Sequence, residues 1–232
     1  MEELGCLVEM RALEGSVDIL IETPPENYLV KVGEMPSNFR ILRATNRHVV
    51  HPGLIRVTLS GIDGEGMTND GIHLRLMMPL ERGRAPVWPV INENGGTSWP
   101  QGDDKLHTRF VTIRHIRIDQ REIDVDIATH EGGLISDWAT LEGDDQQVGV
   151  MGPGGDPGLE HTKNVILAAD ATGLPAIARL IESVEGRVTG HLFAAVPDEA
   201  SLEAYLPTSF LTITAIPEDA FAAQVPELIA AC

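Results

Sequence analysis

The pattern of apolar residues changes between residues 153 and 163, and this change restricts the fold more than any other feature of the sequence. Before it, short runs of alternating apolar and polar residues are separated by Gly, Pro, Asn or Asp, as in Leu54-Ile-Arg-Val-Thr-Leu59. Alternation with a period of two is typical of half-buried antiparallel strands. After it, the run Val165-Ile-Leu-Ala-Ala169 is wholly apolar, which favours a parallel strand buried on both faces. We therefore expect an antiparallel β-barrel followed by a small parallel α/β domain.

The same patterns predict the individual elements. Strands are expected at residues 16–22, 27–32, 38–45, 53–60, 71–79, 108–118, 121–129, 147–151, 165–169, 191–196 and 210–216. Helices are expected at residues 134–141, 174–184, 201–205 and 217–231. Residues 93–105 are polar and contain Gly, Asn, Asp and Pro, so they are expected to form a surface loop. Three segments follow: an N-terminal extension (1–37), the barrel (38–157) and the α/β domain (158–232).

The charge of the chain argues against two classes of partner. The formal net charge is −18 at pH 7, which disfavours binding to nucleic acids and stable association with anionic membranes. The first residues contain no apolar run of the signal-peptide type. No stretch reaches the ~18 consecutive apolar residues of a membrane helix. A cytoplasmic location is therefore expected.

Residues that often bind metals are present but not clustered. Cys6 and Cys232 lie near opposite ends of the chain, outside any Cys-x-x-Cys pattern, and His48-x-x-His51 has no evident carboxylate partner. Zinc sites need several ligands that recur at characteristic spacings. No metal site is expected, and the two cysteines are interpreted as incidental thiols.

Two local motifs have the chemistry of an anion site. Arg109 lies near the start of a predicted strand, and its planar guanidinium suits a pyrophosphate. Further on, Gly132-Gly133 lead into a predicted helix whose first N–H groups, together with the Ser136 hydroxyl, are donors. Each motif also has a purely structural interpretation: an arginine on a solvated strand face, and glycines that only shape a turn. Trp138 is interpreted more readily as a core residue.

Taken in order along the chain, these and further motifs resemble the siderophore-interacting protein family. The family carries an Arg-x-Tyr-Ser/Thr motif, an Asp-x-Asp strand that ends at a histidine, a Gly-rich turn before Trp-Ala, and Gly-Pro-Gly-Gly. The corresponding segments here are Arg109-Phe-Val-Thr112, Asp124-Val-Asp126 with His130, Gly133 to Ala139, and Gly152 to Gly155. Further similar segments are Gly71 to Leu76, Pro86 to Pro89 and Ala169 to Ala178, so the resemblance covers about residues 40–216.

The resemblance implies that NAD(P)H reduces FAD and that the flavin reduces the Fe(III) of a bound ferric siderophore, which releases the iron. By the family's pattern, Arg109 holds the FAD pyrophosphate and Thr112 lies near the reactive flavin nitrogen. Residues 133–136 cradle phosphate, and His130 lies along the adenosine. No side chain is assigned as catalytic. The cofactor-binding residues that the resemblance implies are Arg109, Phe110, Val111, Thr112, Asp126, His130, Gly132, Gly133, Leu134, Ile135, Ser136, Trp138, Asp170 and Thr172.

The chain departs from the family pattern at three places. Val111 stands where the family has a tyrosine, whose ring contributes about 1 kcal/mol beyond its area burial when it stacks. Ala171 replaces the glutamate that follows Asp170 in the family's pattern. The family also continues past the strand at 210–216 with another strand, a helix and a basic tail, whereas this chain stops at Cys232. These departures keep an alternative open, namely a non-catalytic relative that retains the fold but binds flavin or siderophore weakly.

Overall fold

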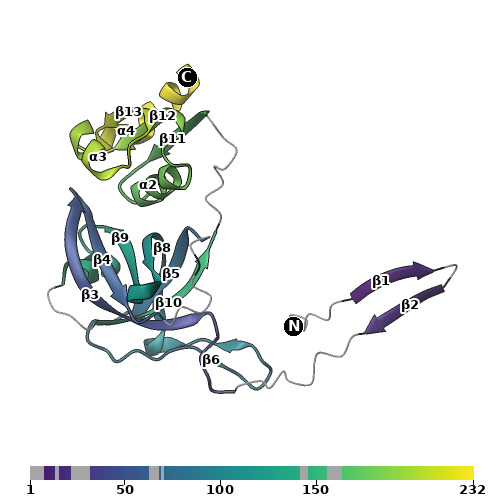
Figure 1. Cartoon of the computed structure of the whole chain (residues 1–232). Helices are drawn as coiled ribbons and strands as arrows, with labels where there is room; N and C mark the ends of the chain where they lie inside the picture. Colours follow the sequence, from purple (N-terminus) through teal and green to yellow (C-terminus); the bar gives the residue numbers. More distant parts are fainter. Residues whose placement is uncertain are drawn as a thin grey trace.

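A computed structural model describes residues 8–13, 16–21, 32–62, 68, 71–141, 146–155 and 164–232 (Figure 1). At the N-terminus, β1 (Val8–Leu13) and β2 (Ser16–Ile21) pair antiparallel. The expected strand at 16–22 is therefore present, but its partner is the segment before it. The strand expected at 27–32 falls almost wholly outside the described residues.

Six antiparallel strands form a closed barrel, as the alternating runs predicted. The strands are β3 (Phe39–His51), β4 (Leu54–Ser60), β5 (His73–Pro79), β8 (Leu106–Arg117), β9 (Glu122–Ala128) and β10 (Gln146–Gly154). Around the barrel their order is β10-β3-β4-β9-β8-β5. One side chain in two points inward, and the barrel core includes the fully buried Leu42, Leu59, Leu74, Ile113 and Ile123. Apolar burial of this kind is the main force that closes the barrel.

Short elements complete the barrel. The connection from β5 to β8 contains β6 (Val90–Ile91), β7 (Thr97–Ser98) and the 3₁₀ turn η1 (Gly102–Asp104). The surface loop expected at 93–105 is largely exposed and carries only β7 and η1. A second 3₁₀ turn, η2 (Ile118–Gln120), joins β8 to β9, where a hairpin was predicted. Helix α1 (Leu134–Thr140) packs Ile135, Trp138 and Ala139 into the barrel core.

The α/β domain contains a parallel sheet of order β11-β12-β13. Its elements are β11 (Asn164–Ala169), α2 (Leu174–Ser183), β12 (Thr189–Ala195), α3 (Glu199–Tyr205), β13 (Phe210–Ile216) and α4 (Glu218–Ala231). Helices α2 and α3 share a core with Val165 and Leu192, whereas α4 packs on Phe193 and Ile216. Adjacent residues of a strand point to opposite faces, so α4 covers the other face of the sheet. Helices on both faces are typical of a parallel sheet, which confirms the predicted fold class.

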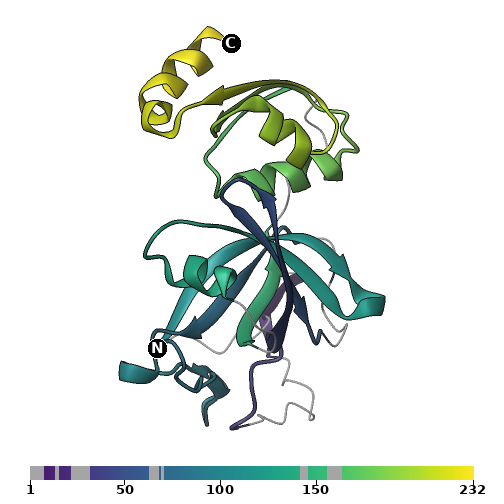
Figure 2. The same cartoon turned by 90° about the vertical axis from the view of Figure 1, so that its left-hand side faces the viewer.

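The α/β domain lies over one end of the barrel (Figures 1 and 2). Helix α2 contacts β8, and α3 contacts the end of β3. Leu54, at the start of β4, is fully buried and belongs to the apolar core of the α/β domain. The two domains therefore share buried surface. Among the described residues no helix combines the length and the apolar character that crossing a membrane requires.

Candidate functional site

A cavity of about 770 Å³ opens where the barrel meets the α/β domain. This volume lies in the range of roughly 300–1,000 Å³ that is typical of small-molecule sites. All the residues predicted to bind cofactor line it, except Trp138 and Asp170. His73, His107, Ile127 and Ala128 also line it and were not predicted. The motif Gly71 to Leu76 contains His73, but nothing in its spacing indicated which of its side chains faces a ligand.

Strand β8 forms one wall of the cavity. Its pairing with β5 places Thr112 opposite His73 and Arg109 opposite Leu76. Arg109 is exposed, and the one hydrogen bond recorded for its side chain is donated to the neighbouring Thr108 carbonyl, at 3.0 Å. Within the described parts of the chain no carboxylate forms an ion pair with Arg109. Its guanidinium is therefore available to an anionic ligand, and this placement favours the anion-site interpretation over a solvated strand face.

A histidine beside this arginine shares the cavity wall. Burial, and then the charge of Arg109, lower the pKa of His107 below its usual range. The cavity also contains His73 and His130. Arg109 provides a fixed positive charge among these rings, because a guanidinium stays protonated.

Two neighbouring residues of β8 differ in their surroundings. Val111 packs against the barrel core and also lines the cavity. Phe110 points to the opposite side of the strand and is 64% exposed. Its ring meets the His73 ring edge-on, with centroids 5.0 Å apart, and the Arg75 guanidinium lies 5.2 Å from its centroid. An aromatic ring is therefore present at the cavity, but not at the position where the family pattern has its tyrosine.

The turn before α1 also lines the cavity. Gly132 has a φ of +74°, a left-handed conformation that favours glycine. At Gly133, a Cβ atom would lie 2.3 Å from Cε1 of His130, so the imidazole packs directly over the glycine. Gly133 is the N-cap of α1 and has no side chain to cap the helix. The first N–H groups of the helix therefore keep their capacity to bind an anion.

The Ser136 hydroxyl is engaged within this turn. It accepts a hydrogen bond from the His130 N–H at 2.8 Å and donates one to the His130 carbonyl at 2.9 Å. The side chain is buried. Ser136 thus fixes the position of His130. Hydrogen bonds from this turn to a phosphate would therefore be donated by backbone N–H groups.

The α/β domain contributes Thr172, which lies in the turn that follows β11. Asp170 Oδ1 accepts hydrogen bonds from the Thr172 N–H at 2.9 Å and from the Gly173 N–H at 3.2 Å. Asp170 therefore holds the turn but does not line the cavity. Ligands of parallel α/β sheets bind at the carboxyl ends of the strands, and this turn is at such an end.

Trp138 lies outside the cavity, in the barrel core. The Arg47 guanidinium lies 5.5 Å from the centre of its ring. Trp138 also lines a second hollow of about 750 Å³, which shares Gly132 and Leu134 with the cavity. The core interpretation of Trp138 therefore fits the structure better than the cofactor contact.

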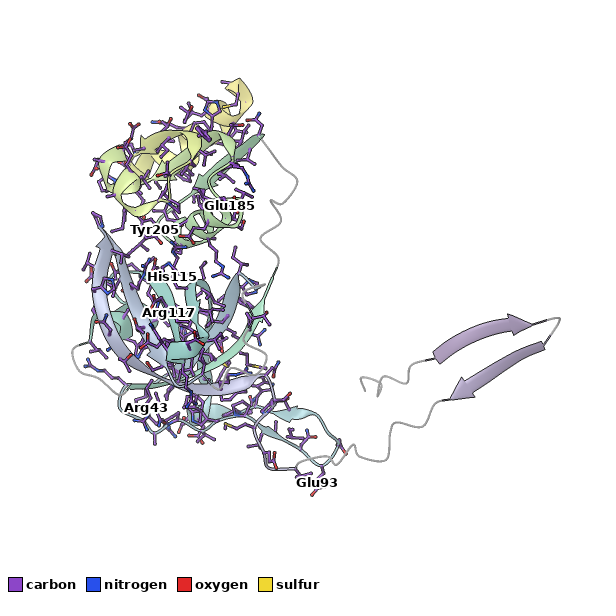
Figure 3. The ribbon with its side chains drawn as sticks, in the orientation of Figure 1. Arg43, Glu93, His115, Arg117, Glu185 and Tyr205 are labelled. Atoms are coloured by element: carbon purple, nitrogen blue, oxygen red, sulfur yellow. The ribbon has the colours of Figure 1, made fainter. Side chains whose placement is uncertain are left out.

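Asp126 lines the cavity, but its carboxylate is directed into the domain junction. Arg56 donates to both oxygens, at 2.7 and 2.8 Å, and the Tyr205 hydroxyl donates to Oδ2 at 2.6 Å. The Asp126 side chain is fully buried. Burial, together with the neighbouring Asp126 charge, raises the pKa of Tyr205 far above its usual range, so its hydroxyl stays protonated and donates. Figure 3 shows Tyr205 between the two domains.

Two family models match the chain in succession. Residues 43–157 match the siderophore-interacting FAD-binding domain, and residues 162–232 match the siderophore-interacting protein model. The chain belongs to the siderophore-interacting protein family. The resemblance seen in the sequence is thereby confirmed.

Relatives of known name support this membership. The chain is 32% identical over 163 residues to ferric vibriobactin reductase ViuB of Vibrio cholerae, which covers 68% of this chain and 59% of that protein. It is 28% identical over 149 residues to the NADPH-dependent ferric-chelate reductase of Escherichia coli, covering 63% of this chain and 57% of that protein. The chain thus spans less than two thirds of the length of these relatives.

Solved structures show the same fold. The siderophore-interacting protein SipS from Aeromonas hydrophila superposes with a TM-score of 0.68 at 24% identity, covering 84% of this chain and 74% of that one. A siderophore utilization protein from T. fusca gives a TM-score of 0.65 at 24% identity, covering 84% of this chain and 78% of that one. These likenesses establish the barrel followed by the α/β domain as the family's architecture.

FAD is the cofactor of the matched barrel domain, and the residues present fit it. A pyrophosphate needs fixed positive charge and N–H donors, and both Arg109 and the start of α1 line the cavity. The missing Cβ atom of Gly133 makes room for the His130 imidazole, which lies over this backbone position. The donors that remain for a pyrophosphate are the Arg109 guanidinium and the backbone N–H groups at the start of α1.

Proposed function

We propose that this chain is a flavin-dependent reductase of ferric siderophores, which passes electrons from NAD(P)H through FAD to Fe(III). One observation carries the proposal: Arg109 to Thr112, the turn before α1 and Thr172 of the α/β domain line a single cavity. When bound, FAD would accept two electrons as a hydride from the nicotinamide and release them singly to Fe(III). Reduced iron binds weakly to hard-oxygen chelators, so reduction would release it from the siderophore.

The chain's own residues would bind and orient the cofactor. Arg109 would hold the pyrophosphate with two parallel hydrogen bonds, a geometry that its planar guanidinium favours. The N–H groups at the start of α1 would bind the same phosphates. Thr112, which pairs with His73 across β5 and β8, would donate its hydroxyl to the ring system. No residue is assigned a bond-making role, because the reaction would proceed by electron and hydride transfer.

The substrate and the location are part of the same proposal. The ferric siderophore would meet the flavin at the open side of the cavity, where His73, Phe110 and Arg75 lie together on the outer face of β5 and β8. Their aromatic and cationic character suits a ferric chelate that carries negative charge. A reductase that uses NAD(P)H would act in the cytoplasm, where that donor is available.

A second candidate is a relative that retains the fold without turnover. Val111 favours it, because an aliphatic side chain on this wall cannot stack on a flavin ring as a tyrosine does. Ala171 also favours it, because the turn that carries Thr172 has no glutamate next to Asp170. Phe110 keeps an aromatic ring at the cavity, which supports the reductase instead.

The test begins with the absorbance spectrum of the purified chain, before and after addition of FAD and gel filtration. A retained flavin band with resolved vibronic structure is expected. NADPH or NADH is then added without oxygen, followed by a ferric tris-catecholate or a ferric trihydroxamate and a chelator specific for ferrous iron. Bleaching of the flavin, its reoxidation by the ferric complex and formation of the ferrous chelate would support the reductase. Absence of a flavin band at excess FAD would contradict it and favour the second candidate.

A further inference from the structure

The cavity draws its walls from both domains, so its shape depends on how the domains are held. Residues of β5, β8 and the α1 turn come from the barrel, whereas Thr172 comes from the α/β domain. A shift of the α/β domain on the barrel would move Thr172 and the β11 turn relative to Arg109 and Thr112. The contacts that fix this relation are therefore part of the site, although most of their side chains lie outside its walls.

Helix α2 attaches directly to the strand that carries Arg109 to Thr112. Arg179 of α2 is 8% exposed. Its guanidinium donates to the carbonyls of Ile113 at 3.1 Å and Gly71 at 3.1 Å. Ile113 follows Thr112 in β8, so the α/β domain is anchored next to the residues proposed to face the flavin.

A second set of contacts, here named the interface cluster, lies on the other side of β8. It consists of Arg56, Arg114 and Asp126 from the barrel and Glu182 and Tyr205 from the α/β domain. Arg114 donates two hydrogen bonds to Glu182, at 2.9 and 2.8 Å, and its Nε lies 3.5 Å from Oδ2 of Asp126. The Arg114 guanidinium also lies 5.9 Å from the centre of the Tyr205 ring.

Because the cluster is largely buried, its hydrogen bonds allow little change in geometry. The side chains of Arg114 and Asp126 are 4% and 0% exposed. A buried charge is stable only while its partners keep good hydrogen-bond geometry. Apolar contacts, such as those of Leu54 with the α/β core, hold the domains together but tolerate sliding, because the hydrophobic effect has no direction. The hydrogen bonds of the cluster therefore select one register of the domains.

We propose that Tyr205 and Glu182 are positioning residues, which hold the α/β domain in one register on the barrel and so align the nicotinamide donor with the flavin. The inference rests on the proposed function for its kinetic consequence. Neither residue lines the cavity, so neither touches the cofactor. They act through Asp126 and Arg114, whose backbones belong to the strands that form the cavity wall and its neighbour.

The experiment uses Tyr205→Phe, Glu182→Gln and the double variant, each loaded with FAD and mixed with NADPH in a stopped-flow instrument. The dissociation constants for FAD and NADPH are expected to stay within about twofold of wild type. Neither substituted side chain lines the cavity, and Asp126 keeps both hydrogen bonds from Arg56. The limiting rate of flavin reduction is expected to fall about tenfold in the double variant, since a misplacement of about 1 Å costs up to roughly a hundredfold in rate. A fall in rate without loss of binding distinguishes positioning from general damage to the fold.

Glu185→Gln is the matched control, because Glu185 lies just beyond the end of α2 and its carboxylate pairs with the exposed Arg187. It is expected to leave rate and binding unchanged. A limiting rate within twofold of wild type in the double variant would overturn the inference, and so would an equal rate loss in Glu185→Gln.

Calorimetry separates the failure of this inference from the failure of the proposed function. If the wild-type chain bound no FAD, the proposed function would fail, but the cluster would still be judged by thermal unfolding without flavin. Separation of one unfolding transition into two in the double variant would support the fixed register. Thermograms that superimpose on those of wild type and Glu185→Gln would overturn it.

Discussion

The barrel and the α/β domain use their arginines differently. In the barrel, Arg109 faces the cavity with no carboxylate partner among the described residues. In the α/β domain, Arg179 is buried and directed into the barrel, and Arg187 pairs with Glu185 at 2.6 Å. The barrel therefore has a cation to offer to a ligand, whereas the cations of the described part of the α/β domain serve attachment and surface pairing. The cofactor phosphate should depend on the barrel, and the α/β domain should depend on the barrel for its position.

Two aspartates of β9 show the same contrast at close range. Asp124 pairs within the barrel, with Thr58 at 2.8 Å and with Arg117, whose side chain is 31% exposed. Asp126, on the same face of the strand, pairs with Tyr205 from the other domain and with Arg56, which is 16% exposed. Figure 3 shows Arg117 and His115 on the barrel, below Tyr205. The two carboxylates have similar chemistry but differ in how much water reaches their partners.

The largest expected effect compares Asp126→Ala with Asp124→Ala. Removing one member of a buried ion pair costs about 3–5 kcal/mol of unfolding free energy, because the remaining charge is left without a partner. Asp126→Ala should show this cost, since Arg56 and Arg114 stay mostly buried. Asp124→Ala should cost about 1–2 kcal/mol, because Arg117 and His115 are open to water. Urea unfolding followed by circular dichroism measures both, and equal losses would refute the proposed difference between the clusters.

The next effect tests the cation that the barrel offers to the cofactor. Arg109→Ala should weaken FAD binding at least tenfold, because a hydrogen bond to a charged group contributes about 1.5–3 kcal/mol. Quenching of FAD fluorescence on binding gives the dissociation constant. Arg187→Ala, in the exposed ion pair of the α/β domain, is the matched control and should leave FAD affinity unchanged. An unchanged affinity in Arg109→Ala would remove this residue from the phosphate site.

The fold was predictable because its signals are local. Alternation in the run from Leu54 to Leu59 and the apolar run from Val165 to Ala169 depend on period and length alone, and they identified the barrel and the parallel sheet. The residues of the cavity walls were named as a set through the resemblance to the family, which several motifs in order support, because each motif taken alone also has a purely structural interpretation.

The interface cluster was not predictable from the same patterns. Tyr205 and Asp126 are separated by 79 residues, and nothing in the local sequence of either residue indicates the other. The same limit applies to Asp170 and Ser136, whose side chains have donor and acceptor chemistry suited to a ligand. In the structure both side chains form hydrogen bonds within their own turns. Whether such a side chain binds its turn or a ligand depends on the direction in which it points, which the sequence spacing does not show.

The contribution of Asp124 to the stability of the fold should depend on pH. Although burial opposes ionisation, hydrogen bonds from Arg117, His115 and Thr58 hold the pKa of Asp124 well below its ordinary value of 3.8. A depressed folded-state pKa gives stability that is present above the unfolded-state value and is lost as the pH falls through the folded-state value. The stability difference between wild type and Asp124→Asn should therefore be constant from about pH 8 to pH 5.

That difference should narrow below about pH 4, as the wild-type carboxylate is protonated. Urea midpoints at a series of pH values measure it, with the exposed Asp119→Asn as control. A difference that widened as the pH fell would contradict the assigned direction of the pKa.

Val111→Tyr tests the barrel wall of the cavity by placing there the aromatic ring that the family pattern has at this position. A stacked ring contributes about 0.5–1.5 kcal/mol beyond area burial, so FAD affinity should rise roughly fivefold. Because Val111 also packs against the core, unfolding of the variant without FAD should be recorded in parallel. Val111→Phe is the companion variant, since it adds the ring without a hydroxyl. If neither substitution tightened FAD binding, Phe110 would be the aromatic contact, and Phe110→Ala should then weaken it.

The smallest effect concerns the choice between NADH and NADPH, which differ by a 2′-phosphate. A cation that binds this phosphate would give about tenfold or more preference for NADPH. The described part of the α/β domain contains two arginines, Arg179 and Arg187. Arg179 donates to a barrel carbonyl and Arg187 pairs with Glu185. The two donors should therefore reduce the flavin with kcat/KM values within about threefold of each other. Steady-state reduction of a ferric chelate with each donor measures the ratio.

A strong preference for NADPH would instead mean that Arg187 exchanges Glu185 for the phosphate, and Arg187→Ala would then abolish the preference. It would also show that the α/β domain contributes a cation to a ligand, so that the two domains are less different in this respect than their arginine pairing indicates.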